Sequence, residues 1–189
     1  MKKSPYSLDL NAPFILGMTG LSLVALVIDM IPSVELARTF AAYRTSASDP
    51  MQYLRLFTHV VIHADLSHYV ANFMMILAIG PLVEEKYSSG RLCLMTILTA
   101  LITGLVIVLF FPATAVVGAS GIVFMLILLA SFTNIRQGTL PITVPLVAVL
   151  YIGNEIILGL FTTSNISRIS HIVGGLCGAC FGIIFSSRK

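Results

Sequence analysis

Six apolar stretches constrain the fold of this chain more than any other feature. They lie at residues 14–32, 66–83, 92–111, 119–133, 142–161 and 169–186, between polar or Pro/Gly-marked breaks. A helix of about 20 apolar residues crosses the hydrocarbon core of a bilayer. Only 10% of the 189 residues are charged and 57% are hydrophobic, so the chain has too few charges to solvate a water-soluble fold. We therefore predict an all-α membrane protein with six transmembrane helices.

The same pattern predicts a single membrane domain with short ends. We expect residues 1–13 to form a cytoplasmic N-terminal segment, 14–186 the six-helix domain and 187–189 a cytoplasmic tail. No convincing signal-peptide cleavage site follows the first apolar stretch, so we interpret that stretch as a retained helix. Lys and Arg are more numerous in the loops on the side of the N-terminus, which predicts that both termini are cytoplasmic.

The loop between the first two stretches, residues 33–65, is long and mixes charged with apolar side chains. It carries too many apolar residues for a free tether. We therefore expect it to lie partly embedded in the outer interface of the membrane.

Charge and cysteine usage exclude several classes of function. The net charge of +3 is scattered, without runs of like charge, so nucleic-acid binding has no support. Cys93, Cys177 and Cys180 lie inside apolar stretches, where cysteine behaves as a small hydrophobe. We expect no redox role for them and no cofactor.

The first polar site lies where the long loop meets the second apolar stretch. Unpaired polar groups at membrane depth are costly, and they are typical of functional sites. His68 and Asn72 are four residues apart, so they share one face of the expected helix. His63 lies five residues before His68 and points elsewhere. We expect His63 to brace the loop rather than join a cluster.

The second polar site, Gly118-Ala119-Ser120-Gly121, opens the fourth stretch. About twelve helical residues follow Ser120, which places it roughly 18 Å above the cytoplasmic edge of a core about 30 Å thick. The third stretch ends near Pro112, so the chain must descend to Ser120 as irregular backbone inside protein or a wet cavity. A serine at a buried helix start lies near free N–H groups, which suit a developing oxyanion.

The third polar site is His171, early in the sixth stretch. Gly174, Gly178 and Gly182 follow it at helical spacing and leave a groove into which another helix can press. If that neighbour is the fourth stretch, His171 reaches Ser120. A serine hydroxyl bonded to an imidazole is an activated nucleophile. No Asp or Glu is an evident third member.

Each of these sites also has a packing interpretation. A serine between glycines, a glycine series or a single histidine in a membrane helix is more often structural than catalytic. The combination favours function, because three separate segments place a polar group where one outward-opening cavity could collect them.

Together these residues resemble the rhomboid family of intramembrane serine proteases. The resemblance covers residues from about 53 to 186 and follows the order and spacing of the family's motifs. These motifs are His63-x4-His68-x3-Asn72, Gly118-x-Ser120-Gly121 and His171-x2-Gly174-x3-Gly178. The resemblance implies a small six-helix rhomboid-like bundle with a partly membrane-embedded first loop.

The resemblance also implies roles for individual residues. Ser120 would be the nucleophile and His171 the general base, a dyad without an acidic third member. His68, Asn72 and the Ser120 backbone N–H would form the oxyanion hole. Glu84 resembles the family's structural acid at the end of the second helix.

The implied activity is that of an endopeptidase acting in the membrane. It would cut transmembrane or membrane-anchored proteins near the outer end of their transmembrane helix, through an acyl-enzyme, without metal. Residues 142–161 would be a mobile lateral gate. The expected partners are substrate proteins and the lipid bilayer, and the short six-span chain favours a bacterial plasma membrane.

The chain departs from the family pattern at two positions. Where many members have Trp-Arg in the first loop, this chain has Leu54-Arg55. Where many have a tyrosine beneath the catalytic histidine, it has Phe124. The ring can still stack there but lacks a hydroxyl to orient His171, so we expect slower turnover rather than none.

Three alternatives remain. The first is a catalytically weak or inactive rhomboid-like protein that binds membrane clients, although this chain keeps both serine and histidine. The second is a zinc-dependent membrane protease or metal transporter that uses His59, His63, Asp65 and His68. The required His-Glu-x-x-His pattern is absent from the sequence. The third is a structural protein in which these polar residues only pack.

Overall fold

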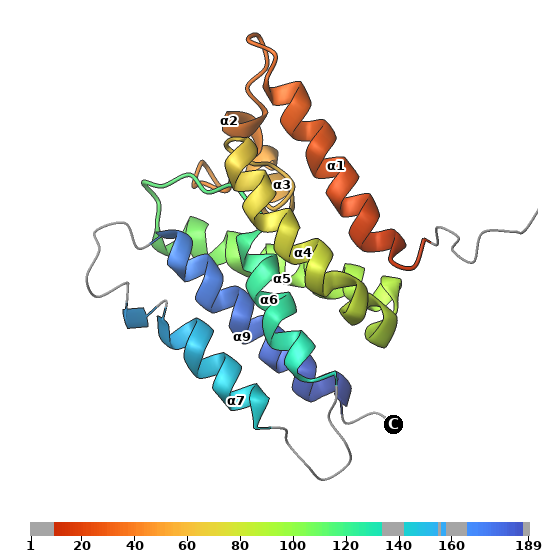
Figure 1. Ribbon diagram of the computed structural model, residues 1–189. Helices are drawn as coiled ribbons and strands as arrows, with labels where there is room; N and C mark the ends of the chain where they lie inside the picture. The colour runs from red at the N-terminus through yellow and green to blue at the C-terminus, as the bar shows by residue number, and fades with distance from the viewer. Residues whose placement is uncertain (1–9, 134–141, 155, 158–165, 187–189) are drawn as a thin grey trace, which may run out of the picture.

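A computed structural model describes residues 10–133, 142–154, 156–157 and 166–186. Within these ranges the regular elements are helices, and each expected apolar stretch contains one (Figure 1). They are α1 (Pro13–Asp29), α2 (Leu36–Phe40), α3 (Pro50–Thr58), α4 (Leu66–Tyr87), α5 (Ser89–Phe110), α6 (Ser120–Ser131), α7 (Thr143–Ala148), η1 (Val149–Gly153) and α9 (Ile166–Ser186).

Three of the described helices, α4, α5 and α9, are long and apolar enough to cross a membrane. The helices α1 and α6, and the run formed by α7 and η1, are apolar but shorter. The prediction of an all-helical membrane fold is therefore confirmed. Six complete crossings remain a prediction.

The observed helix boundaries differ clearly from the predicted ones at the turn between α4 and α5. The apolar stretch predicts an end near residue 83, yet α4 continues past the internal Pro81 to Tyr87, and α5 starts at Ser89. The single connecting residue, Ser88, has a φ of 73°. The Ser89 hydroxyl donates to Glu84 Oε1 at 2.7 Å, so polar contacts extend both helices beyond the hydrophobic pattern.

The helix α6 lies at the centre of the bundle, and its neighbours are α4, α5, α7 and α9 (Figure 1). Nearly every side chain from Gly121 to Leu129 is buried. This helix is apolar around its whole circumference, as expected for one surrounded by protein. Ser120, its first residue, is therefore held on a central support.

The contact between α6 and α9 is close enough for backbones to touch. A Cβ atom added to Gly174 would overlap the carbonyl oxygen of Gly121, and one added to Gly178 would overlap that of Met125. Small residues at helical spacing allow such an approach. The expectation that another helix presses onto the glycine series is confirmed, and this helix comes from the fourth apolar stretch.

The helices α1 and α4 are joined by a buried carboxylate. Glu84 accepts the N–H groups of Phe14 and Ile15, both at 2.9 Å. These N–H groups belong to the first turn of α1 and have no partner within that helix. A carboxylate also suits the positive end of the helix dipole. Glu84 therefore caps α1 from the far end of α4.

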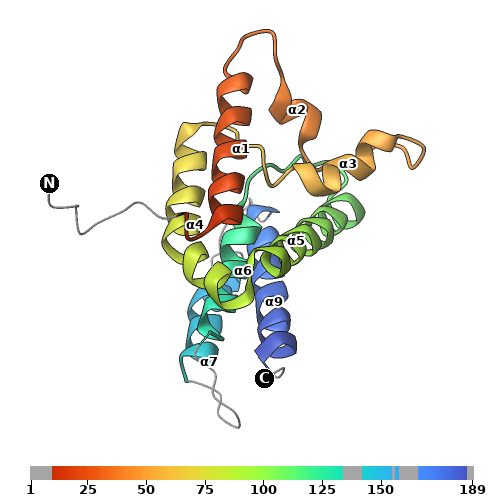
Figure 2. The same ribbon diagram turned by 90° about the vertical axis from the view of Figure 1, so that its right-hand side faces the viewer.

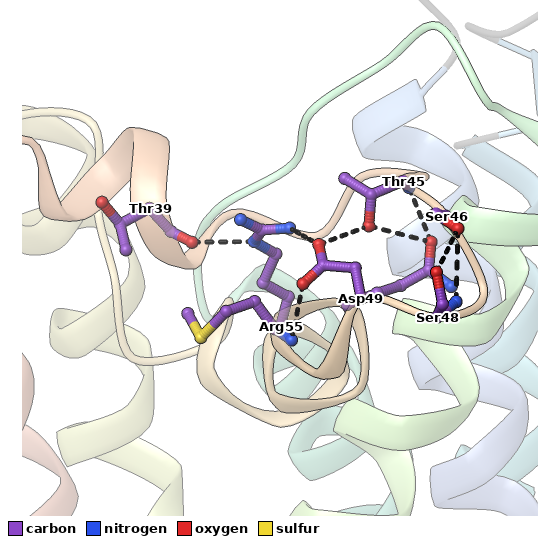
Figure 3. A network of polar contacts seen from close by, with 8 residues as sticks. Thr39, Thr45, Ser46, Ser48, Asp49 and Arg55 are labelled. Carbon is purple, nitrogen blue, oxygen red and sulfur yellow. Dashed lines mark hydrogen bonds and ion pairs between the residues drawn. The ribbon is translucent and has the colours of Figure 1, made fainter.

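The first loop is folded around a buried arginine (Figure 3). Arg55 donates through Nε to the Thr39 carbonyl at 2.8 Å and through a guanidinium NH to Asp49 at 3.2 Å. Its guanidinium lies 4.2 Å from the centre of the Tyr43 ring. A hydrogen bond from Thr45 is the main cause that lowers the pKa of Asp49. This network orders the loop whose composition predicts partial embedding.

Figure 2 shows where this ordered loop lies, with α2 beside the upper end of α1 and α3 alongside α5. A backbone atom of Leu56 in α3 lies 2.9 Å from the position of a Cβ atom on Gly104 in α5. The helix α3 is therefore packed directly on the α5 backbone.

Candidate active site

The segment that leads into Ser120 is irregular backbone, as the sequence predicts. It runs from Phe111 to Ala119 between α5 and α6. Gly118 has a φ of 118°, a conformation that only glycine adopts readily. A Cβ atom there would also collide with the His68 ring. Backbone conformation and the nearby ring therefore both require glycine two residues before the serine.

The first loop holds this segment by hydrogen bonds. Ala42 and Val116 exchange two backbone hydrogen bonds of 2.9 and 3.0 Å. The Gly118 N–H donates to the His59 carbonyl at 2.9 Å, and the Ala119 N–H donates to His63 Nε2 at 3.3 Å. Three points of the loop thus determine where Ser120 begins its helix.

The hydrogen bonds of His63 define its tautomer. Nδ1 lies 3.2 Å from the Val61 carbonyl, which can only accept, so Nδ1 carries the proton and Nε2 is free to accept. Burial, with a smaller contribution from the neighbouring His68, lowers the pKa of His63 to about 4. The ring lies 5.1 Å from that of His68. His63 braces the loop as expected. The expectation that it points away from the polar cluster is wrong, because its ring packs edge-on against that of His68.

His59 contributes to the same support through its backbone and its side chain. Nδ1 lies 3.0 Å from the Arg55 carbonyl, and Nε2 lies 3.4 Å from the Thr103 hydroxyl of α5. Burial lowers the pKa of His59 to about 4. Within the described residues no three His, Cys, Asp or Glu side chains group as metal ligands. Of the other two zinc candidates, Asp65 caps α4 by accepting the backbone N–H of His68 at 2.8 Å.

The polar residues singled out by sequence surround one cavity of about 380 Å³. Ser120 at the start of α6, His171 in α9, and His68 and Asn72 in α4 all line it. Its apolar walls are Ala71, Val116, Val117, Val123 and Phe124. The structure therefore brings the three polar sites together, as the cavity hypothesis expects.

An aromatic stack supports His171 within this cavity. The Phe124 ring lies parallel to the imidazole, with centroids 4.3 Å apart and planes at 7°. The Tyr151 ring of η1 meets the Phe124 ring edge-on, with centroids 6.0 Å apart. The loss of the usual tyrosine thus leaves the stack in place and removes only its hydroxyl.

Asn72 presents a buried hydrogen-bond donor with no partner in the described structure. Its side chain is 6% exposed, and Nδ2 makes no hydrogen bond there. Buried amide groups are normally paired, because an unpaired one costs about 1–3 kcal/mol. An unpaired donor in the same cavity as Ser120 suits a ligand that carries a negatively charged oxygen.

Sequence reasoning missed several residues that shape this site. Ala42, Val116 and Val117 carry no functional signal, because they act through backbone groups or as apolar walls. Tyr151 appears in the sequence only as one more aromatic residue near an interface. The role of His59 as a backbone acceptor had no signal either.

The fold and the cavity define a helical membrane protein with a serine and a histidine at a shared internal site. Its sequence matches the Rhomboid domain over residues 50–188. It is also 31% identical over 153 residues to Rhomboid protease GluP of Bacillus subtilis (strain 168), covering 79% of this chain. The chain belongs to the rhomboid family and is an integral membrane protein. It spans 29% of the length of this relative.

Proposed function

We propose that this protein is an intramembrane serine endopeptidase. The observation that carries the proposal is the shared cavity of Ser120, His171, His68 and Asn72, with a stacked ring behind the histidine. Membership of the rhomboid family and similarity to a relative named as a protease support the same activity.

In the proposed reaction Ser120 Oγ attacks the carbonyl carbon of the scissile peptide bond. His171 accepts the hydroxyl proton and then gives it to the leaving amine as the C–N bond breaks. The resulting acyl-enzyme is hydrolysed by a water molecule, whose proton passes to His171 and then to Ser120 Oγ. The proposed dyad has no acidic third residue, and the Phe124 ring stacked on the imidazole limits its orientation.

The tetrahedral intermediates of both steps carry a negatively charged oxygen. We assign its stabilisation to Asn72 Nδ2, His68 and the Ser120 backbone N–H at the start of α6. Preorganised donors of this kind stabilise the transition state without reorganisation. The unpaired state of Asn72 Nδ2 in the described structure supports this assignment.

The proposed substrates are transmembrane or membrane-anchored proteins, cut near the outer end of the transmembrane helix. In this proposal six helices cross a bacterial plasma membrane, both termini are cytoplasmic, and residues 142–161 form the lateral gate. Part of that stretch, and the charged residues near both termini, lie outside the described residues.

A second candidate function is a weak or inactive rhomboid-like protein that binds membrane clients. Phe124 favours it, because a phenyl ring offers His171 no hydroxyl. The two functions differ in whether a membrane-anchored reporter is cut or only retained.

The deciding experiment is reporter cleavage in membranes. Wild type should cut a membrane-anchored reporter, and Ser120→Ala should abolish cleavage while the protein still accumulates. Ser131→Ala is the matched control, since its hydroxyl donates to the Leu128 carbonyl at the other end of α6. Normal cleavage by Ser120→Ala would exclude the serine mechanism. A chelator should leave the rate unchanged.

A further inference from the structure

The run formed by α7 and η1 lies at the edge of the bundle, against α6 and α9 (Figure 1). Val144 is the one buried residue in these two helices. Leu146, Val149 and Leu150 are each more than half exposed, so they face away from the protein. The attachment of this run to the bundle therefore depends on a small number of side chains.

One of these side chains is Ile152, which lies in a notch on α9. The notch exists because residue 175 is glycine. A Cβ atom on Gly175 would lie 3.2 Å from both Cγ1 and Cδ1 of Ile152, and 3.6 Å from Cδ2 of Leu128 in α6. Ile152 is also packed against the hydrophobic core. It therefore reaches the backbone of α9 near the seam between α9 and α6.

The glycines of α9 differ in what they face. A Cβ atom on Gly174 or Gly178 would overlap backbone atoms of α6, which cannot give way. A Cβ atom on Gly175 would press on the flexible end of the Ile152 side chain instead. Gly174 and Gly178 thus fix α6 on α9, whereas Gly175 is matched to a side chain that can leave.

The contact of Ile152 lies one helical turn from the candidate catalytic histidine. Gly175 follows His171 by four residues, so the two share a face of α9. The preceding residue of η1, Tyr151, meets the Phe124 ring that stacks on His171. Consecutive residues of η1 therefore contact the aromatic stack and the next turn of α9.

The fit of Ile152 in its notch decides how firmly η1 is held. Lipid chains are as apolar as leucine, so the hydrophobic effect does not hold one helix on another in a bilayer, and close packing must do so. The dispersion contacts of a side chain in a notch are lost when it leaves. The π-helical turn that carries Ile152 is also a less stable backbone form, which favours release.

We propose that Ile152, seated at Gly175, is the latch that holds α7 and η1 on the bundle, and that its release admits the transmembrane segment of a substrate to Ser120. This inference rests on the proposed function and names the residue that controls entry to its site. The cavity at Ser120 is present with Ile152 seated, so a small reagent needs no release. The latch thus controls cleavage of transmembrane substrates and leaves the reactivity of Ser120 unchanged.

The test compares cleavage of a transmembrane reporter with fluorophosphonate labelling of Ser120 in the same variants. Ile152→Ala empties the notch, so it should raise kcat/KM for the reporter several-fold and leave the labelling rate unchanged. Adding Gly175→Ala to this variant returns a methyl group to the notch and should bring cleavage back towards wild type. Leu150→Ala is the matched control, because Leu150 lies in the same helix and is 59% exposed. It should change neither rate.

A covalent lock tests the opposite direction. A Cβ atom on residue 175 lies beside Cγ1 of residue 152, within reach of a disulfide. Ile152→Cys and Gly175→Cys are therefore combined with alanine at the three natural cysteines, Cys93, Cys177 and Cys180. In the oxidised protein cleavage of the reporter should be lost while labelling persists, and a reductant should restore cleavage.

Three results would overturn the latch. They are equal cleavage by the oxidised and reduced double-cysteine protein, an unchanged rate in Ile152→Ala, and a parallel fall of cleavage and labelling in Ile152→Ala. The last would show that Ile152 supports the dyad instead of controlling entry. Failure of the proposed function looks different, because wild type would then show neither cleavage nor labelling, and the latch would fall with it.

Discussion

The two flanks of α6 are built differently. On the α9 side the helices touch through backbone, with Gly174 on Gly121 and Gly178 on Met125. On the α7 side the described contact at the cavity is one ring edge, Tyr151 on Phe124. Many side chains of α7 and η1, such as Leu146 and Val149, are exposed.

This contrast separates two tasks. The α9 side carries His171, which lines the same cavity as Ser120, and the backbone contact limits how far the two helices can shift against each other. The π-helical turn of η1 on the other side is a less stable backbone form, often found at functional sites. We infer that chemistry depends on the α9 side and that substrate entry depends on the α7 side. Substitutions on the two sides should therefore differ in effect.

The largest effect is expected from Gly174→Ala. Its new methyl group would overlap the Gly121 carbonyl, so α9 must move and carry His171 with it. Overpacking of this kind costs about 1–3 kcal/mol, and a displacement of about 1 Å can reduce turnover on the order of 10²-fold. Reporter cleavage and the unfolding midpoint should both fall.

The matched control comes from the α7 side. Gly153→Ala in η1 adds the same methyl group where nothing lies within 4 Å, so it should leave both quantities unchanged. Equal losses in the two variants would show that the flanks do not differ as described.

Asn72→Ala tests the donor on the α4 side of the cavity. It should lower kcat by about 10²-fold, the cost of removing one oxyanion donor. The unfolding midpoint should not fall, because Nδ2 makes no hydrogen bond in the described structure. A fall in stability with unchanged kcat would demote Asn72 to a packing residue.

His63 tests the support of the segment before Ser120. His63→Leu removes the acceptor of the Ala119 N–H and should lower activity about tenfold, as expected for one hydrogen bond. In His63→Gln a side-chain oxygen can accept that N–H, so activity should largely return. If both variants behave alike, the hydrogen bond does not position the serine.

The same histidines predict a dependence of stability on pH. Burial lowers the pKa of His59 and His63 from 6.5 to about 4 in the folded protein. Between these values the unfolded chain binds more protons, so stability should fall as pH drops from 6.5 to 4. The pKa of Asp49 in the folded protein lies below 3.8. Its contribution to stability is therefore lost only as the pH falls below 3.8. The unfolding midpoint measured across this range should fall, and less steeply in His63→Gln.

The smallest effect is expected on the α7 side. Tyr151→Ala removes one edge contact with Phe124, and such aromatic pairs contribute about 0.5–1.5 kcal/mol. Because Phe124 keeps its stack on His171, labelling of Ser120 should slow only about threefold. Tyr151→Phe keeps the ring and is the control. A loss as large as that of Gly174→Ala would contradict the proposed division of tasks.

The sequence predicted the parts of this structure that local pattern encodes. The apolar stretches located the helices, and the helical spacing of Gly174 and Gly178 predicted a close helix contact. The Phe111-Pro112 end of the third stretch predicted the irregular approach to Ser120. The grouping of Ser120 and His171 required the additional assumption that the fourth and sixth stretches are neighbours.

The remaining parts depend on contacts between distant residues. Nothing in the local sequence pairs Ala42 with Val116, because that contact uses backbone groups alone. The short helix α3 was not predicted, since its polar capping and the buried Arg55 interrupt the apolar pattern. The acceptance of the Ala119 N–H by His63 depends on how the loop returns to α6.

The central claim is that Ser120 is a nucleophile activated by His171. A fluorophosphonate reacts with an activated serine whatever the substrate, so its labelling of the purified protein in detergent tests this claim directly. We predict labelling of wild type and Ser131→Ala, and none of Ser120→Ala or His171→Ala. Labelling of Ser120→Ala equal to wild type, or no labelling of folded wild type, would contradict the claim.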